Sequence, residues 1–169
     1  GEMELERLYL RAPSFWADQD VALRLGTPVT AIDPWAKSIT LGGETIPYET
    51  LVLTTGSSPR RLPAAIGGDL AGVHTVRTLA DVDAMAPEFR PGARLLVIGG
   101  GYIGLEAAAV ASKLGLAVTL VEMAPRILQR VAAPETSGYF PKLHQDHGVT
   151  ILEGVGLERL SGEGRVTSA

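Results

Sequence analysis

The chain has 169 residues, 46% hydrophobic and 20% charged, values typical of a globular protein with one sizeable core or two small ones. Its net charge of −4 disfavours nucleic-acid binding, and its apolar runs are broken well short of the roughly 20 residues that a membrane helix needs. It contains no cysteine, which excludes a disulfide or thiolate metal site within this sequence and is compatible with a cytoplasmic location.

The first third of the chain predicts β-structure after one short helix. Ser14 is expected to cap a helix over "FWADQD". The β-prone runs "VALRLG", "PVTAID", "KSITL" and "ETIPY" follow, and Gly42-Gly43 predicts a tight hairpin between the last two. Thr50 to Gly56, "TLVLTTG", predicts a buried strand, and "SSPRRLP" after it predicts a linker.

The remainder predicts strands that alternate with helices. "TLAD" from Thr78 resembles a capping box that opens a helix through about Phe89. We expect buried strands over "ARLLVIG", "LAVTLVE" and "VTIL", with helices at residues 102–114 and 134–147 between them. Pro141 should kink or restart the second helix. This alternation predicts an α/β fold with a parallel sheet.

A glycine-rich motif lies between the first of these strands and its helix. The spacing is Gly99-x-Gly101-x-x-Gly104, with Gly100 inside it. In this context the first glycine permits a tight turn, the second lets the backbone approach a pyrophosphate, and the third lets the helix pack closely on the strand. The helix N-terminus then presents free N–H groups to the anion. The alternative is a glycine turn that serves packing alone.

Glu122 ends the next strand, about 20 residues further along the chain. A carboxylate there can accept hydrogen bonds from both ribose hydroxyls of an adenosine and repel a 2′-phosphate, which favours NAD over NADP. Arg126 and Arg130 could instead receive a 2′-phosphate. A surface glutamate without such a role is the other interpretation.

Two further sets of polar residues have competing interpretations. Glu106 lies in an otherwise apolar helix, either facing solvent or, with Tyr102 and Ile103, near the reactive end of a dinucleotide. His144 and His147 have helical spacing, but no third ligand lies nearby, so we predict a surface pair and no metal site.

The run "LLVIGGGYIGLEAAAVASKLGLAVTLVEMAPRIL" resembles the NAD domain of flavoprotein pyridine-nucleotide oxidoreductases, and most closely NADH:ferredoxin reductases. The segments "YETLVLTTGSSPRRLP", "VRTLADVDA" and "LHQDHGVTILEG" extend the resemblance over nearly the whole chain. It implies Rossmann-like FAD- and NAD-binding domains with a parallel sheet and a β-meander. We expect residues 1–58 to be part of the FAD domain and residues 59–169 an NAD domain that is truncated at its C-terminal end. The family's first FAD glycine motif is absent, so we expect a fragment.

The resemblance also implies roles for individual residues. Val29, through its backbone, would meet the FAD adenine, with Thr55, Gly56 and Arg77 along the flavin dinucleotide. Residues 99–104 would hold the NAD pyrophosphate. Glu106 would lie by the nicotinamide carboxamide. Glu122 and Arg130 would lie at the adenosine end. Val29 could instead be a core residue, and Arg77 a solvated side chain.

The activity that the resemblance implies is hydride transfer from NADH to FAD, followed by electron delivery to a [2Fe–2S] ferredoxin. The cofactors supply the chemistry, so no catalytic acid or base is predicted. Alternatives are an NADH oxidase, a rubredoxin reductase or a disulfide reductase whose dithiol lies outside this sequence. A non-catalytic NAD-binding or redox-sensing module is the alternative from another class.

Overall fold

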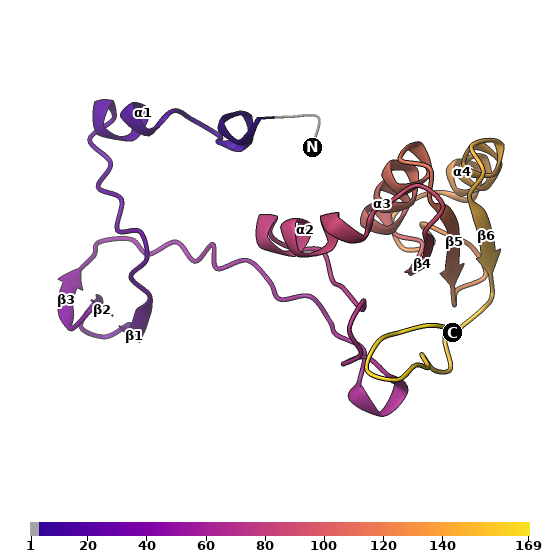
Figure 1. The fold of residues 1–169 in the computed structure, drawn as a ribbon. Helices are drawn as coiled ribbons and strands as arrows, with labels where there is room; N and C mark the ends of the chain where they lie inside the picture. Colours follow the sequence, from indigo (N-terminus) through magenta and orange to yellow (C-terminus); the bar gives the residue numbers. More distant parts are fainter. Residues whose placement is uncertain (1–3) are drawn as a thin grey trace. The chain divides into compact units, whose positions relative to one another are not determined.

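Figure 1 shows a computed structural model of the chain, which describes residues 4–169. The chain divides into two compact units, residues 1–55 and residues 56–169. The first unit contains, in chain order, the 3-10 helix η1 (Leu5–Leu8), α1 (Pro13–Asp18), β1 (Val29–Asp33), β2 (Ser38–Leu41) and β3 (Glu44–Pro47).

The strands of the first unit form an antiparallel meander in the order β1-β2-β3. The expected hairpin is confirmed: Gly42 and Gly43 both have positive φ, at 56° and 86°, between β2 and β3. Leu41 is the one buried hydrophobic side chain among those that the structure describes in this unit. The meander therefore has a very small core.

Two β-strands expected in the first third are not formed. Residues 21–26 and residues 50–56 have no regular secondary structure, and Val52 and Leu53 are 74% and 64% exposed. A strand needs a neighbour to satisfy its backbone N–H and C=O groups. No strand pairs with either run among residues 4–169, so β-propensity alone does not create one.

The start of α1 also differs from the prediction. Ala12, not Ser14, is the N-cap, and Pro13 occupies the first helical position. Proline is favoured at this position because its missing N–H would have no helical partner and its φ already suits the helix. The proline therefore decides where the helix begins, and Ser14 lies inside it.

The second unit contains the parallel sheet. Its elements are η2 (Ala64–Ile66), α2 (Leu79–Met85), η3 (Ala86–Glu88), β4 (Arg94–Ile98), α3 (Tyr102–Lys113), β5 (Ala117–Glu122), α4 (Pro134–Asp146) and β6 (Thr150–Glu153). The strands pair in parallel in the order β4-β5-β6. The expected α/β fold with a parallel sheet is thus confirmed.

One face of this sheet packs against α3 and α4 (Figure 1). The core combines the small residues Ala108 and Ala111 of α3 with Val118 and Leu120 of β5 and Ile151 of β6. Small side chains on α3 let the helix lie close to the strands, which fixes where its N-terminus emerges above the sheet. No helix among residues 4–169 is both long and apolar enough to cross a membrane.

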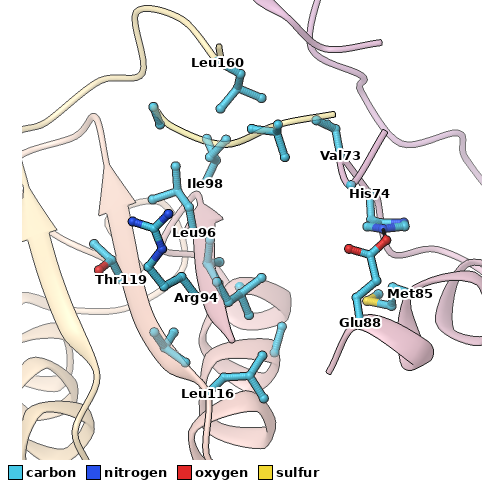
Figure 2. A pocket seen from close by; sticks show the side chains of 18 of the residues that line it. Val73, His74, Met85, Glu88, Arg94, Leu96, Ile98, Leu116, Thr119 and Leu160 are labelled. Carbon is cyan, nitrogen blue, oxygen red and sulfur yellow. Dashed lines mark hydrogen bonds and ion pairs between the residues drawn. The ribbon is translucent and has the colours of Figure 1, made fainter. Parts of the chain in front are cut away.

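The opposite face of the sheet is not packed, which corrects the expectation that the first of these strands is buried. Alternate residues of β4, including Leu96 and Ile98, point into a hollow of about 1410 Å³, while Leu95 and Val97 pack on the core (Figure 2). This volume exceeds the roughly 300–1,000 Å³ of typical ligand sites. The hollow is an uncovered sheet face rather than a shaped pocket.

Helix α4 continues through Pro141 as one element, so the proline does not restart it, and the kink expected there stays a prediction. His144 is buried, not at the surface: its Nδ1 lies 3.0 Å from the Phe140 carbonyl and its Nε2 lies 3.2 Å from that of Leu105. The ring therefore joins α4 to α3, while His147 contacts the Leu143 carbonyl of its own helix.

Candidate functional site

The glycine turn follows β4 and leads into α3. Gly99 has φ 108°, a conformation that side chains rarely adopt. A Cβ built on Gly104 would lie 2.1 Å from the carbonyl oxygen of Gly99, far inside van der Waals contact. These two glycines are therefore needed by the fold itself, because one makes the turn and the other lets α3 begin directly above it.

Gly101 has a different environment from its neighbours. A Cβ built there would have no heavy atom within 4 Å apart from its chain neighbours. Gly101 is also the N-cap of α3, and no side chain caps the helix at this end. The first N–H groups of α3 thus have no side-chain acceptor, and there is open space at Gly101, an arrangement suited to an anionic group such as a phosphate.

Glu122, at the end of β5, is bonded directly to this turn. One carboxylate oxygen accepts the N–H of Gly100 at 2.8 Å, and the other accepts the N–H of Ala124 at 2.7 Å. A carboxylate offers about four lone-pair positions, so acceptor capacity remains for ligand hydroxyls. Glu122 is half-buried, which leaves it within reach of a ligand above the turn. Its predicted contact with a ribose stays a prediction.

Arg126 and Arg130 are not equivalent candidates for a 2′-phosphate. The Arg126 guanidinium donates to the carbonyls of Ala132 at 3.0 Å and Gln129 at 3.2 Å and to the hydroxyl of Ser137, which is 1% exposed. Arg126 thus braces the loop before α4. Arg130 is exposed and is the better candidate for ligand contact.

The predicted nicotinamide-end residues lie on the first turns of α3. Tyr102 and Ile103 are 56% and 62% exposed, and Glu106 is exposed as well. The cost of burying a carboxylate therefore does not arise for Glu106, and the structure places it at a solvent-facing helical position. Whether it contacts a nucleotide stays a prediction.

The residues predicted for FAD are divided between the two units. Val29 opens β1 and is 48% exposed, so it is not a core residue. Thr55 has no regular secondary structure. Gly56 has φ 71°, and a Cβ built there would lie 3.2 Å from the guanidinium of Arg77, whose Nε donates to the Ser57 carbonyl at 3.1 Å. Arg77 is exposed, and this hydrogen bond ties it to the segment after Gly56, while its contact with FAD stays a prediction.

The predicted capping box of α2 is confirmed. Asp81 accepts the backbone N–H of Thr78 at 2.7 Å, and the Thr78 hydroxyl accepts the N–H of Asp81. Hydrogen bonds from the Thr78 backbone and side chain lower the pKa of Asp81. The carboxylate also accepts the N–H of Arg77 at 3.0 Å, so the cap helps to fix that arginine.

A charged cluster lies across the hollow from the sheet. Glu88 contacts His74 at 3.1 Å and also pairs with Arg165 (Figure 2 shows His74 and Glu88). Partial burial raises the pKa of Glu88, but the bond to His74 and the charge of Arg165 outweigh it, so the pKa lies below its ordinary value. The cluster joins η3 to two loop segments and contributes no ligand group at the glycine turn.

Two residues that shape the turn, Ile127 and Glu153, were not predicted from the sequence. A Cβ on Gly100 would come within 2.4 Å of Ile127, so this glycine serves packing, and the N–H of Ile127 is accepted by Glu153 at 2.7 Å. A signal was present in the sequence, because "VTLVE" and "VTILE" both end a parallel strand with glutamate. The packing of Ile127 on Gly100 has no such signal.

The comparison with protein-family models decides the family. Residues 7–169 match the pyridine nucleotide-disulphide oxidoreductase model, which is nearly the whole chain. The chain belongs to this family. Its parallel sheet, glycine turn and meander are thus those of a pyridine nucleotide-disulphide oxidoreductase, as the sequence resemblance implied.

Several relatives within the family are ferredoxin reductases. The chain is 44% identical to the 5,5'-dehydrodivanillate O-demethylase ferredoxin reductase subunit of Sphingobium sp., over 96% of this chain and 40% of that protein. It is 41% identical to putidaredoxin reductase of Pseudomonas putida, over 99% and 41%. The chain thus spans about 40% of the length of these curated relatives.

A solved structure agrees with this assignment. The covalent putidaredoxin reductase–putidaredoxin complex matches with a TM-score of 0.89 and 40% identity, over 99% of this chain and 42% of that one. A likeness of this degree places the chain in the same fold, with both of its units covered by one solved protein.

Proposed function

We propose that this chain carries the NAD-binding site of an NADH-dependent flavoprotein that passes electrons to a [2Fe–2S] ferredoxin, working in the cytoplasm. The observation that carries the nucleotide site is Gly101, which faces open space at the uncapped N-terminus of α3 beside the Glu122 carboxylate. The ferredoxin acceptor is supported by the ferredoxin reductases among its relatives.

In this proposal each part of the site has a physical task. The N–H groups at the start of α3 bind the pyrophosphate, and the bare Gly101 lets it approach. Glu122 orients the adenosine ribose and rejects a 2′-phosphate. Val29, Thr55, Gly56 and Arg77 are proposed to contact FAD. The chemistry that FAD supplies when bound is acceptance of a hydride and release of single electrons.

The experiment uses the full-length protein that contains this sequence. We expect it to be yellow as purified, to lose its flavin absorbance when NADH is added without oxygen, and to reduce a [2Fe–2S] ferredoxin. A protein that bleaches but transfers electrons only to oxygen or to a disulfide would be one of the alternative flavoenzymes. A colourless protein that binds NAD would contradict the enzymatic proposal and indicate a binding module.

A further inference from the structure

A short segment after β5 packs against the glycine turn. It consists of residues 126–128, here called the strap. The N–H of Leu128 donates to the carbonyl of Gly100 at 2.9 Å, and the fully buried side chain of Ile127 packs on Gly100 so closely that no Cβ would fit there. The position of Gly100 therefore depends on the position of the strap.

The strap has a backbone conformation that needs support. Leu128 has φ 54°, in the left-handed region, which costs a residue with a side chain on the order of 1 kcal/mol or more. Such a conformation persists when surrounding bonds hold it. The Arg126 guanidinium supplies one set of hydrogen bonds to groups further along the chain. Its acceptors are the carbonyls of Gln129 and Ala132 and the hydroxyl of Ser137.

Glu153 supplies the bond on the other side. It ends β6, and its carboxylate accepts the N–H of Ile127 at 2.7 Å. Glu153 itself is exposed, whereas Ile127 has no exposed surface, and loss of this hydrogen bond to a charged acceptor costs about 1.5–3 kcal/mol. The strap would then shift to regain a partner and would draw Gly100 with it.

Glu153 and Glu122 are direct neighbours in the sheet. They are paired in the β5–β6 register, so their side chains leave the same face of the sheet where these strands end. Glu122 accepts the N–H of Gly100, while Glu153 acts through the strap on the carbonyl of the same glycine. Hydrogen bonds thus hold the turn at both backbone groups of Gly100: Glu122 accepts its N–H, and Leu128 of the strap donates to its carbonyl.

We propose that Glu153 is a positioning residue for the nucleotide-binding turn, acting through the strap rather than by contact with the nucleotide. This proposal rests on the proposed function, because it gives Glu153 its importance through NADH binding at the turn. This role requires an acceptor oxygen at the end of a side chain as long as that of glutamate. A glutamine at position 153 should therefore serve nearly as well.

The test compares Glu153→Ala, Glu153→Gln and the control Glu158→Ala in the full-length flavoprotein. Glu158 is exposed, and its side chain forms no hydrogen bond or ion pair among residues 4–169. We expect Glu153→Ala to raise the KM for NADH about tenfold with kcat changed less than about twofold. Glu153→Gln and Glu158→Ala should stay within about twofold of the parent protein in both constants.

A second readout does not depend on the nucleotide. Amide hydrogen exchange of residues 97–104, measured without NADH, should be about tenfold faster in Glu153→Ala and unchanged in the other two variants. If the parent protein fails to bind NADH, the proposed function fails, while the exchange measurement still judges the link between Glu153 and the turn.

Three outcomes would overturn the proposal. One is an unchanged KM and unchanged exchange in Glu153→Ala. Another is a lowered melting temperature with an unaltered KM, which would make the bond merely structural. The third is a KM for NADH that Glu153→Gln raises as much as Glu153→Ala does. If the alanine variant does not fold, Glu153→Asp decides, because it withdraws the acceptor by one methylene: a raised KM supports the proposal and an unchanged one contradicts it.

Discussion

Gly104, in the first turn of α3, lies so close to Gly99 that a Cβ at position 104 would lie 2.1 Å from the Gly99 carbonyl oxygen, whereas a Cβ at Gly101 would meet no heavy atom within 4 Å. Two glycines of one motif, three residues apart, thus have separable tasks. Gly104 lets α3 pack closely over the turn, and Gly101 leaves open space above it.

The first prediction tests this difference between Gly101 and Gly104. Gly101→Val should abolish NAD binding without unfolding the sheet, because its side chain enters the space proposed for the pyrophosphate. Gly104→Ala should destabilise the fold by about 1–3 kcal/mol, since α3 must move away from the turn. NAD titration and thermal unfolding of both variants distinguish the two effects. Retained affinity in Gly101→Val would mean that the glycines serve packing alone.

The second prediction concerns the choice between NADH and NADPH. The full-length protein should prefer NADH, because the negative charge of Glu122 repels a 2′-phosphate. Glu122→Gln keeps one acceptor oxygen for the N–H of Gly100, gives up the bond to the N–H of Ala124 and removes the charge, so the preference should fall roughly tenfold, or about 1.4 kcal/mol. Steady-state rates with each nucleotide test this. Equal or better efficiency of the parent protein with NADPH would sink the prediction and point to Arg130.

The fold was largely predictable because its signals are local. The alternation of strands and helices, the hairpin at Gly42 and the capping box at Thr78 each depend on a few consecutive residues. The failures involve partners distant in the sequence. Residues 50–56 have β-propensity but no strand beside them, and the buried ring of His144 meets the Leu105 carbonyl, which lies 39 residues earlier in the chain.

The same distinction applies to the candidate site. The glycine spacing and Glu122 follow a known pattern and could be found in the sequence. The support of Gly100 by Ile127, and of Ile127 by Glu153, requires three segments to meet in space. The bracing role of Arg126 depends likewise on the loop folding back onto Ser137, so the sequence left it as a possible phosphate ligand.

The third prediction uses the charged cluster at Glu88. The pKa of the Glu88 carboxyl in the folded chain lies below its ordinary value of 4.5, so the ionised form of Glu88 stabilises the fold at higher pH. That contribution is fully present above the ordinary value and is lost as the pH falls through the lowered pKa. The melting temperature should therefore drop below about pH 4.5 less steeply in Glu88→Gln than in the parent chain. Parallel slopes for the two proteins would show that the cluster does not contribute.

The fourth prediction compares the two units of the 169-residue chain. The second unit has a core cluster of ten buried residues, whereas Leu41 is the one buried hydrophobic side chain described in the first. Amide hydrogens of residues 94–122 should therefore exchange at least about tenfold more slowly than those of residues 29–47, a difference of about 1.4 kcal/mol. Equal protection of both units would contradict this difference in stability.

The last prediction concerns flavin binding by the 169-residue chain itself. Its predicted contacts with FAD are four residues, of which Thr55 has no regular structure and Val29 lies on an exposed strand. Binding must offset several kcal/mol of lost freedom, and four contacts, two of them on the weakly packed first unit, cannot do so. The nucleotide site is different, because the turn, α3 and Glu122 are held together by the core of the second unit. We therefore expect the purified chain to be colourless and still to bind NAD weakly. An absorption spectrum decides the first point, and a flavin band at stoichiometric intensity would show that these four contacts suffice.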